Sequence, residues 1–256
     1  MSMSSAKETV VIVGATGAMG QVITRRLQAA GQQVVAVART EQALQGLVEA
    51  VPGVLPCVAN IADDAATEAI RQVLQQVGAP VRMVIQGAGV ATAGGVATAP
   101  TAAVVDAVNI KVGGMLRLVR AADGLLTRGS RLVAIGGHYG FEPSAYACTA
   151  GVANAALANL VRQLSWAYGE RGITAHLVAP GPADTERLRR VATDRGAREG
   201  LSADAVLDAM RAESAIGAFT TPEQIAWAMQ LLLAPEADAL AGGTLFMDAG
   251  RRKGMP

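Results

Sequence analysis

The sequence predicts an α/β protein in which helices cover both faces of one doubly wound parallel sheet. Three observations predict this class. Short β-branched runs alternate with longer stretches at helical spacing, a glycine-rich turn joins the first run to the first helical stretch, and apolar residues make up 51% of the 256 residues although only 3% are aromatic. A parallel sheet buried on both faces needs such aliphatic strands, packed under helices that approach closely.

Seven strands are expected from runs of aliphatic and β-branched residues, at 9–13, 33–38, 54–58, 82–86, 131–135, 174–178 and 244–247. Helical patterns separate them at 19–30, 65–77, 101–127, 144–171 and 222–233. Strands joined by helical crossovers lie parallel, and ligands bind beyond their carboxyl ends. Residues of interest follow the strands at that edge: Gly14, Arg39, Asn60, Gly87, Gly136 and Pro180.

The turn after the first strand reads Gly14-Ala15-Thr16-Gly17-Ala18-Met19-Gly20. Gly14 permits a tight turn, Gly17 lets backbone approach a phosphate, and Gly20 lets the new helix pack closely on the sheet. Amides at the helix N-terminus then face the anion. This pattern predicts a dinucleotide pyrophosphate site; the alternative is an ordinary strand–helix turn that binds nothing.

The end of the second strand bears on cofactor choice. An acidic residue there would bind a ribose 2′-hydroxyl, but none occurs before Glu41, and Arg39-Thr40 stands in its place. A guanidinium suits a 2′-phosphate. The sequence therefore favours NADP(H), with NAD(H) still possible; a solvated surface arginine is the alternative interpretation of Arg39.

Composition limits the other function classes. The net charge of +1 gives no general attraction to nucleic acid or to an anionic membrane. The N-terminal segment, residues 1–9, is short and polar and has no signal-peptide core. No apolar stretch is long enough to span a bilayer. Cys57 and Cys148 have no metal-ligand spacing, so no metal is expected. A cytoplasmic protein acting on a small molecule is predicted.

Residues 184–214 form a charged segment after Pro180-Gly181-Pro182. Its place behind the sixth strand suggests a lid over the site, within a single dinucleotide-binding domain that spans residues 1–256. The segment carries Arg187, Arg189, Arg190, Arg195 and Arg198. These arginines either attract an anionic substrate or form a solvated helical face.

Further motifs follow in a fixed order. They are Asn60-Ile61 after the third strand, Gly87, Ala88 and Gly89 after the fourth, Asn109 in the long helical stretch, Pro180, Gly181 and Thr185 after the sixth, and Met247-Asp248-Ala249-Gly250 at the seventh. With the glycine turn, they resemble the motifs of the short-chain dehydrogenase/reductase family over nearly the whole chain.

The resemblance implies a Rossmann-type fold with strand order 3-2-1-4-5-6-7. It also implies a nicotinamide cofactor. The residues expected to hold it are Gly14, Thr16, Gly17, Met19, Gly20, Arg39, Thr40, Asn60, Ile61, Gly87, Ala88, Gly89, Pro180, Gly181 and Thr185. Members of the family are often dimers or tetramers that pair their long helices, so a homo-oligomer is expected.

Catalytic residues are where the resemblance fails. The family uses a Ser, a Tyr, a Lys four residues after the Tyr, and a helix Asn. Tyr146 and Asn109 match two of these, whereas Ala150 stands at the lysine position and Gly137 at the serine position. A free tyrosine has a pKa of about 10, so without a neighbouring ammonium it is a weak base near neutral pH.

Three other side chains are candidates to replace the missing serine and lysine. His138 follows the fifth strand and titrates near neutrality when free, so it joins Tyr146 and Asn109 as a candidate catalytic residue; the alternative is a loop histidine that faces solvent. Tyr139 is a weaker candidate. Lys111 stands two residues past Asn109, about 200° round an α-helix, so it is expected to point away from the site.

Three functions remain open. The first is an NADP(H)-dependent oxidoreductase acting on a carbonyl or alcohol through Tyr146, with an atypical set of proton-handling groups. The second is a catalytically inactive protein that senses NADP(H) or stabilises a partner enzyme. The third is a lyase or isomerase that uses the same cleft without net hydride transfer.

Overall fold

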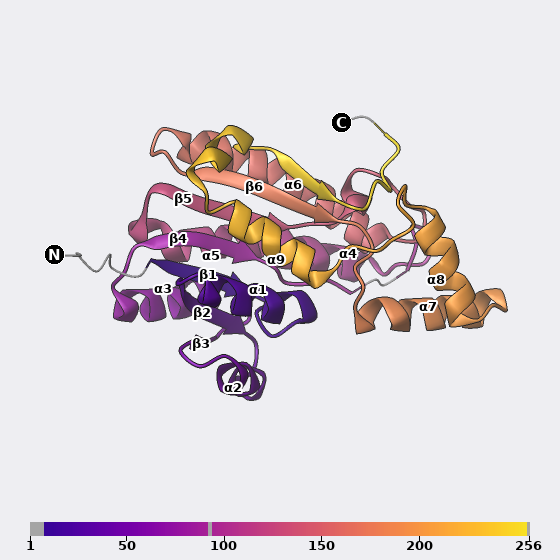
Figure 1. Cartoon of the computed structure of the whole chain (residues 1–256), viewed down its shortest axis with the longest axis horizontal. Coiled ribbons are helices and arrows are strands. Elements are labelled where there is room, and N and C mark those ends of the chain that lie inside the picture. The colour runs from indigo at the N-terminus through magenta and orange to yellow at the C-terminus, as the bar shows by residue number, and fades with distance from the viewer. Residues whose placement is uncertain (1–7, 92–93, 255–256) are drawn as a thin grey trace.

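The computed structural model describes residues 8–91 and 94–254. Most of the N-terminal segment for which no signal peptide is expected therefore lies outside the described residues. Seven strands form one sheet in the order β3-β2-β1-β4-β5-β6-β7, and all neighbouring pairs are parallel. The predicted fold class and strand order are confirmed (Figure 1).

The strands match their expected positions closely. They are β1 (Thr9–Val13), β2 (Gln33–Ala38), β3 (Leu55–Val58), β4 (Val81–Gln86), β5 (Leu126–Ile135), β6 (Thr174–Pro180) and β7 (Thr244–Met247). Strand β5 begins at Leu126, inside a stretch for which the sequence predicts helix. The carboxyl ends of β1, β4, β5 and β6 are thereby placed side by side.

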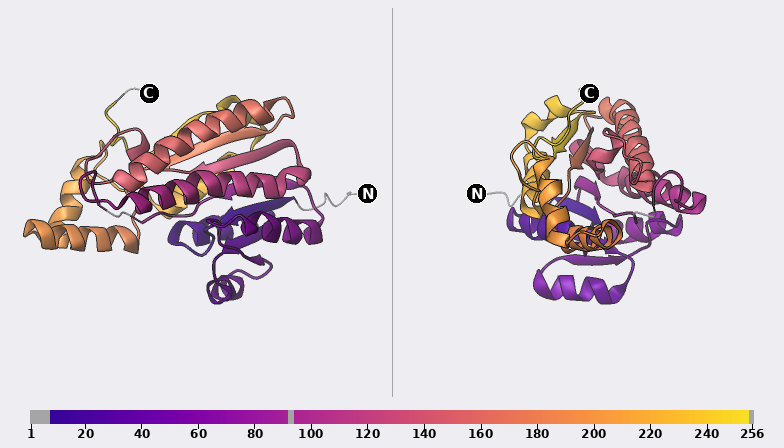
Figure 2. Two further views of the ribbon diagram at one scale, coloured as in Figure 1. Left: turned by 180° about the vertical axis from the view of Figure 1, so that it is seen from behind. Right: turned by 90° about the vertical axis from the view of Figure 1, so that its right-hand side faces the viewer.

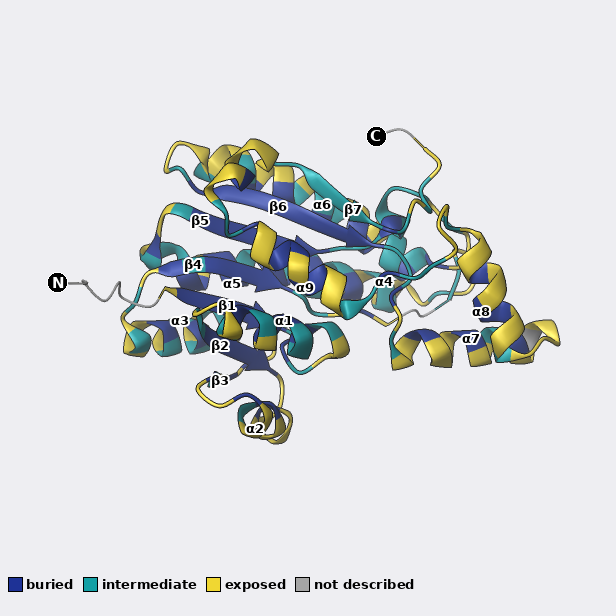
Figure 3. Ribbon diagram, in the orientation of Figure 1, coloured by how far each residue is buried: buried dark blue, intermediate teal, exposed yellow. Residues whose placement is uncertain are grey.

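Both faces of the sheet are buried, and alternate residues of each strand serve opposite layers. Val11 and Val13 belong to the core beneath α3 (Ala65–Val77), α5 (Gly114–Ala122) and α6 (Cys148–Gly169). Val10 and Ile12 belong to the core beneath α1 (Ala18–Ala29) and α9 (Pro222–Leu231). Figure 2 shows the sheet between these two helical layers, and Figure 3 shows the strands buried.

Two helical predictions were wrong in detail. Helix α2 (Glu41–Ala50) was not predicted; Thr40 caps it by accepting a hydrogen bond from the amide of Ala43. The stretch 101–127 is not one helix. It divides into α4 (Thr101–Val108), a π-helical segment (Asn109–Gly113), α5, and a 3₁₀ turn (Asp123–Leu125).

The charged segment 184–214 forms two helices, α7 (Glu186–Glu199) and α8 (Ala203–Ala212). They pack on each other through a small apolar cluster that includes Leu188, Ala192, Val206 and Met210. The pair projects beyond the carboxyl edge of the sheet and is exposed over most of its outer surface (Figure 3). This placement brings α7 and α8 over the strand ends that carry the candidate site.

Candidate active site

The turn after β1 is shaped by its glycines. Gly14 adopts φ +80°, and a Cβ there would lie 2.9 Å from the carbonyl oxygen of Gly87. A Cβ on Gly20 would collide with the backbone of Gly14 and Ala15. Gly17 is the N-cap of α1 and has no side chain to offer its first-turn amides. The turn is thus a backbone surface whose shape and uncapped amides suit a pyrophosphate.

The residues expected at the adenosine end sit at the ends of β2 and β3. Arg39 is exposed, whereas Thr40 is occupied as the cap of α2. Asn60 donates to Asp63 over 2.8 Å and accepts a bond from the amide of Ala62. Ile61 is buried in the core. Arg39 is therefore the cation that this edge presents to solvent.

A cavity of about 600 Å³ opens at the carboxyl ends of β4, β5 and β6. It brings together eight of the predicted site residues: Met19, Gly87, Gly89, His138, Tyr146, Pro180, Gly181 and Thr185. Helices α7 and α8 contribute Arg187, Leu188, Val191, Arg195, Glu199 and Met210 to the same wall. The cofactor-turn side and the tyrosine side of the molecule thus share one volume.

The amide of Gln86 fixes the wall between β4 and the long helix. Its nitrogen donates to the carbonyl of Ile110 over 2.7 Å, and its oxygen accepts from the amide of Ala88 over 3.2 Å. Ile110 lies in the π-helical segment, where carbonyls lose their regular partners. Fully buried Gln86 therefore ties the loop that carries Gly87 and Ala88 to the segment that carries Lys111.

Tyr146 lies at the mouth of the cavity. Its side chain is 49% exposed, and its hydroxyl is hydrogen-bonded to the hydroxyl of Tyr139. Burial, and then the bond to Tyr146, raise the pKa of Tyr139 well above its usual value of 10. Tyr139 therefore keeps its proton at neutral pH and has an O–H to donate to Tyr146.

His138 is buried, so the alternative of a solvent-facing loop histidine is wrong. Burial, followed by the nearby Arg251, lowers the pKa of His138 to about 4. The ring is neutral at pH 7 and stacks on Tyr139 with centroids 3.9 Å apart. A neutral imidazole has one N–H, and the carbonyl of Pro180 faces the ring as an acceptor. His138 therefore lies against Tyr139, its ring tilted by 40°, and has little donor capacity left.

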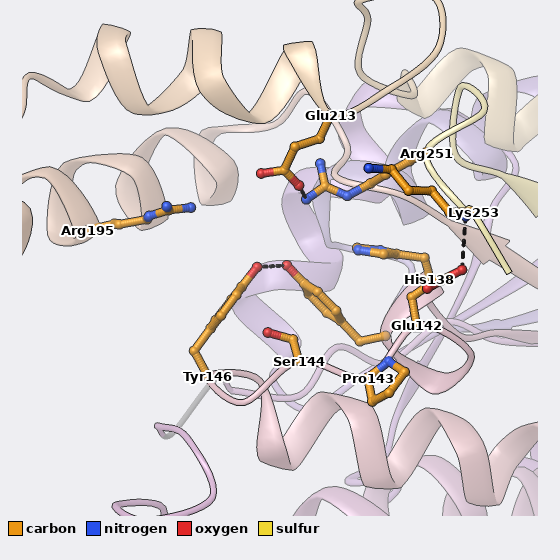
Figure 4. A pocket seen from close by; sticks show the side chains of 10 residues that line it. His138, Glu142, Pro143, Ser144, Tyr146, Arg195, Glu213, Arg251 and Lys253 are labelled. Atoms are coloured by element: carbon orange, nitrogen blue, oxygen red, sulfur yellow. Dashed lines mark hydrogen bonds and ion pairs between the residues drawn. The ribbon is translucent and has the colours of Figure 1, made fainter.

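A second cavity, of about 370 Å³, adjoins the first at Tyr146 (Figure 4). Its wall holds three cations, Arg195 of α7 and Arg251 and Lys253 of the C-terminal segment, and the carboxylates of Glu142 and Glu213. Arg251 is paired with Glu213, and Arg195 with Glu199 over 2.8 Å. Figure 4 shows Arg195 extending toward Tyr146 from the side opposite His138. The charges around the phenol are therefore largely neutralised by one another.

The side chains of Asn109 and Lys111 exchange the directions expected of them: Lys111 enters the cavity and Asn109 does not. Asn109 faces the third-strand edge, where its amide donates to Ala62 over 2.9 Å and accepts from Arg117 over 2.9 Å. Lys111 is the residue that lines the cavity, 5% exposed, and its Nζ donates to the carbonyl of Ile135 over 2.7 Å. The prediction that Lys111 points away from the site was wrong, although the two side chains do diverge as expected.

Positions 150 and 137, where the resemblance leads one to expect a lysine and a serine, are packed as follows. Ala150 packs against an apolar group that includes Val90, Ala107 and Ala153. A Cβ on Gly137 would lie 2.9 Å from the amide nitrogen of Asn154, a buried residue of α6. Asn154 therefore occupies the space that a side chain at position 137 would need.

Neither Lys111 nor Asn154 is among the site residues that the sequence predicts. A signal for Asn154 exists, because it falls on the same helical stripe as buried Leu157 and Val161, where an amide is out of place. Lys111 shows a similar signal, because a charged residue stands between apolar Ile110 and Val112. Within residues 8–91 and 94–254, no group of three His, Cys, Asp or Glu side chains is placed to hold a metal.

None of the helices in the described part of the chain combines the length and apolarity that a membrane span requires.

Comparison with known proteins agrees with the fold. A family model described as enoyl-(acyl carrier protein) reductase matches residues 14–252. Short-chain reductase protein NovJ of Streptomyces niveus is 27% identical over 258 residues, which cover 96% of this chain and 95% of NovJ.

Two other matches span much of the chain. The inactive 2-(S)-hydroxypropyl-CoM dehydrogenase 2 of Xanthobacter autotrophicus is 31% identical over 200 residues, which cover 75% of this chain and 82% of that protein. L-sorbose reductase of Gluconobacter frateurii, solved with NADPH and L-sorbose, covers 100% of both chains with a TM-score of 0.87 at 20% identity. Because the family model spans nearly all of the described fold, the chain belongs to the short-chain dehydrogenase/reductase family of oxidoreductases.

Proposed function

We propose that this protein is an NADP(H)-dependent oxidoreductase that interconverts a small carbonyl compound and its alcohol. The observation that carries the proposal is the 600 Å³ cavity, which joins Met19 and Gly87, next to the glycine turn, to Tyr146. A nicotinamide cofactor would lie along Gly14, Thr16, Gly17, Met19 and Gly20, with its adenosine end at Arg39, Thr40, Asn60 and Ile61. Its nicotinamide end would meet Gly87, Ala88, Gly89, Pro180, Gly181 and Thr185.

The preference for NADP(H) rests on Arg39. Its guanidinium is exposed at the carboxyl end of β2, beside the turn that would hold the pyrophosphate. No acidic residue precedes Glu41 to repel a 2′-phosphate. A planar fork of N–H donors binds phosphate in two places and with charge assistance. NAD(H) lacks that phosphate and would gain nothing from Arg39.

A bound nicotinamide cofactor would supply hydride chemistry at this site, and Tyr146 would supply the proton during carbonyl reduction. The O–H of Tyr139 donates to the Tyr146 oxygen, so it stabilises the phenolate left after Tyr146 gives up its proton. The guanidinium of Arg195 acts on the same phenolate by charge. Neutral His138 positions Tyr139, and α7 and α8 would close over the bound ligands as a lid.

Family membership also underlies two further proposals: that the protein acts in the cytoplasm, and that it assembles as a homodimer or homotetramer. The long helix α6 and the shorter helices α4 and α5 would form the contact between copies. Trp166 of α6 is 86% exposed, which leaves a large apolar side chain on that layer for a partner to cover.

A second candidate function is a protein that binds NADP(H) without turning over a substrate. Ala150 and Gly137 favour it, because they remove the family's ammonium and hydroxyl from the site. The relative from Xanthobacter autotrophicus is itself described as inactive.

One experiment separates the two candidates. Purified protein is titrated with NADPH and NADH, followed by fluorescence, and is then given a panel of ketones and aldehydes while absorbance at the nicotinamide band is recorded. The oxidoreductase predicts tighter binding of NADPH and its oxidation with at least one carbonyl. Binding without oxidation across the panel would favour the binding protein, and failure to bind either nucleotide would refute both.

A further inference from the structure

The second cavity, of about 370 Å³, is lined by cations that the proton transfer proposed above does not explain. Arg195 comes from α7, and Arg251 and Lys253 come from the C-terminal segment that follows β7. Tyr146 lines this cavity and the larger one, so the two volumes meet at this residue. A ligand whose reacting atom is held by Tyr146 can therefore extend from the larger cavity into the smaller one.

The C-terminal segment is fastened to this wall through its backbone. The amides of Lys253 and Gly254 donate to one carboxylate oxygen of Glu142, over 3.0 and 2.7 Å. Among the ion pairs that the described residues form, none involves the ammonium of Lys253. Glu142 thus holds the segment in place without neutralising the Lys253 side chain.

Arg195 is bound through only part of its guanidinium. Its Nε atom donates to Glu199, which lies one turn further along α7, over 2.8 Å. Glu199 lines the larger cavity and not this one. The two terminal nitrogens therefore keep their N–H groups, and Figure 4 shows this end of Arg195 directed toward Tyr146. Two parallel N–H donors on a planar group match the two oxygens of a carboxylate.

Arg251, by contrast, braces the wall. Its Nη1 atom donates to the carbonyl of Met210 over 3.0 Å, and its Nη2 atom is paired with Glu213. The wall as a whole holds three cations and only two carboxylates, those of Glu142 and Glu213. One positive charge is left over, which a single negative charge on a ligand would neutralise. The wall therefore suits a carboxylate better than a neutral group or a phosphate dianion.

We propose that the substrate is an oxo acid whose carbonyl is held by Tyr146 and whose carboxylate lies in the second cavity, between Arg195 and Lys253. Figure 4 shows these two cations on opposite sides of the paired tyrosine hydroxyls. Arg195 supplies a fork of donors, and Lys253 supplies a point charge from the facing wall. The inference rests on the proposed function, because Tyr146 is the proton donor there.

The reaction leaves the carboxylate unchanged. The carbonyl carbon gains a hydride, so that NADPH is oxidised to NADP⁺, and the carbonyl oxygen gains the proton of Tyr146. The product is a hydroxy acid. The carboxylate only orients the substrate, and its binding energy therefore distinguishes an oxo acid from a neutral ketone of the same shape.

The test compares pairs of substrates that differ only in charge. 2-Oxopentanoate and 4-oxopentanoate place the carboxylate at two distances from the carbonyl, and the methyl ester of each removes the charge. With NADPH, the unmodified protein should reduce at least one acid with a kcat/KM about tenfold or more above that of its ester. Calorimetry in the presence of NADP⁺, which has no hydride to give, measures binding of the same compounds without turnover.

Two substitutions probe the facing walls. Lys253→Met should raise KM and the calorimetric dissociation constant for the preferred acid by about threefold to tenfold. It should leave the values for the ester within about twofold, because a neutral ester gains little from this charge. Arg195→Met should lower the acid-to-ester ratio of kcat/KM about tenfold. The effect of Arg195 on the Tyr146 phenolate is shared by acid and ester, so it cancels in that ratio.

Matched controls remove a cation from the same two segments outside the cavity. Arg190 is exposed on α7 and lines neither cavity. Arg252, next to Lys253, lies over the ring of Phe246. Arg190→Met and Arg252→Met should both leave the acid-to-ester ratio unchanged, which separates a local contact from a general loss of positive charge. Thermal unfolding without ligand confirms that each variant folds.

The outcomes are distinct. If the unmodified protein reduces both esters as well as their acids, the inference is overturned while the proposed function stands. A preference for the acid that survives both Lys253→Met and Arg195→Met would also overturn it, because the carboxylate would then bind elsewhere. If the protein reduces no carbonyl compound and binds neither NADPH nor NADP⁺, the proposed function fails and the inference fails with it.

Discussion

The two ends of the cavity are built from different materials. On the β1 side, the surface is backbone. Glycines such as Gly14 and Gly20 set its shape, because a Cβ at either position would collide with neighbouring backbone. On the β5 side, the surface is made of buried side chains that reach in from separate helices, Lys111 and Asn154. A backbone cradle depends on local sequence, whereas a side-chain floor depends on how distant elements pack. The first can be inferred from a motif, and the second cannot.

The largest expected effect is on the proton-handling side. Tyr146→Phe removes the hydroxyl but keeps the ring, and positioned acid–base catalysis contributes about 10²–10⁴ in rate. The kcat for whichever carbonyl is reduced should fall by that factor, with NADPH affinity unchanged. Tyr168→Phe is the matched control, since Tyr168 sits about 30 Å away near the far end of α6. Turnover that survives Tyr146→Phe would assign the proton to another group.

The cradle side responds in stability. Gly20→Ala places a methyl against the backbone of Gly14 and Ala15, so it should lower the free energy of unfolding by about 1–3 kcal/mol and weaken NADPH binding. Gly46→Ala makes the same change in the middle of α2, where nothing lies within 4 Å of the new Cβ. That variant should be more stable by about 0.5–1 kcal/mol. Urea denaturation measures both, and equal effects would mean that the cradle is not tightly packed.

This contrast explains what the sequence could predict. Strands such as Thr9–Val13 are continuous aliphatic runs, so their position and burial follow from periodicity alone. The glycine turn is equally local. Helix α2 escaped prediction because Gly46 interrupts a short and weakly apolar stretch. Thr40, the N-cap of this helix, is predicted from the sequence as a cofactor-binding residue instead.

The orientation of Lys111 depends on information that the sequence does not carry. Helix α4 is apolar on most of its circumference, so periodicity does not say which side meets the sheet. The sequence predicts correctly that the side chains of Asn109 and Lys111 diverge, but it assigns Asn109 rather than Lys111 to the site. The π-helical segment adds a break in phase at that point. Only the packing of Gln86 against Ile110 fixes which of the two side chains enters the cavity.

A smaller effect is expected at the adenosine edge of the cradle. Arg39→Ala should raise the dissociation constant of NADPH about tenfold, since an exposed charge-assisted contact is partly screened by solvent. The affinity for NADH should stay the same, because NADH has no 2′-phosphate. The NADPH-to-NADH ratio, measured by fluorescence titration, is the readout. If both affinities fall together, Arg39 contacts a part of the cofactor that the two nucleotides share.

The smallest expected effect is on how the free energy of unfolding changes with pH. Burial and the nearby Arg187 lower the pKa of Lys111 from its usual 10.5 to about 8, so the folded protein binds this proton less tightly than the unfolded chain does. Stability from this group is therefore lowest below pH 8 and is regained as the pH rises from about 8 toward 10.5. Between pH 7 and 9 the unmodified protein should gain about 1 kcal/mol relative to Lys111→Met.

Other groups that face the cavity do not obscure this change. Neutral His138, with its pKa near 4, and Tyr139 and Arg195, each with a raised pKa, keep their protonation states between pH 7 and 9. A difference in unfolding free energy that stays constant from pH 7 to 9 would show that Lys111 is not a buried ammonium.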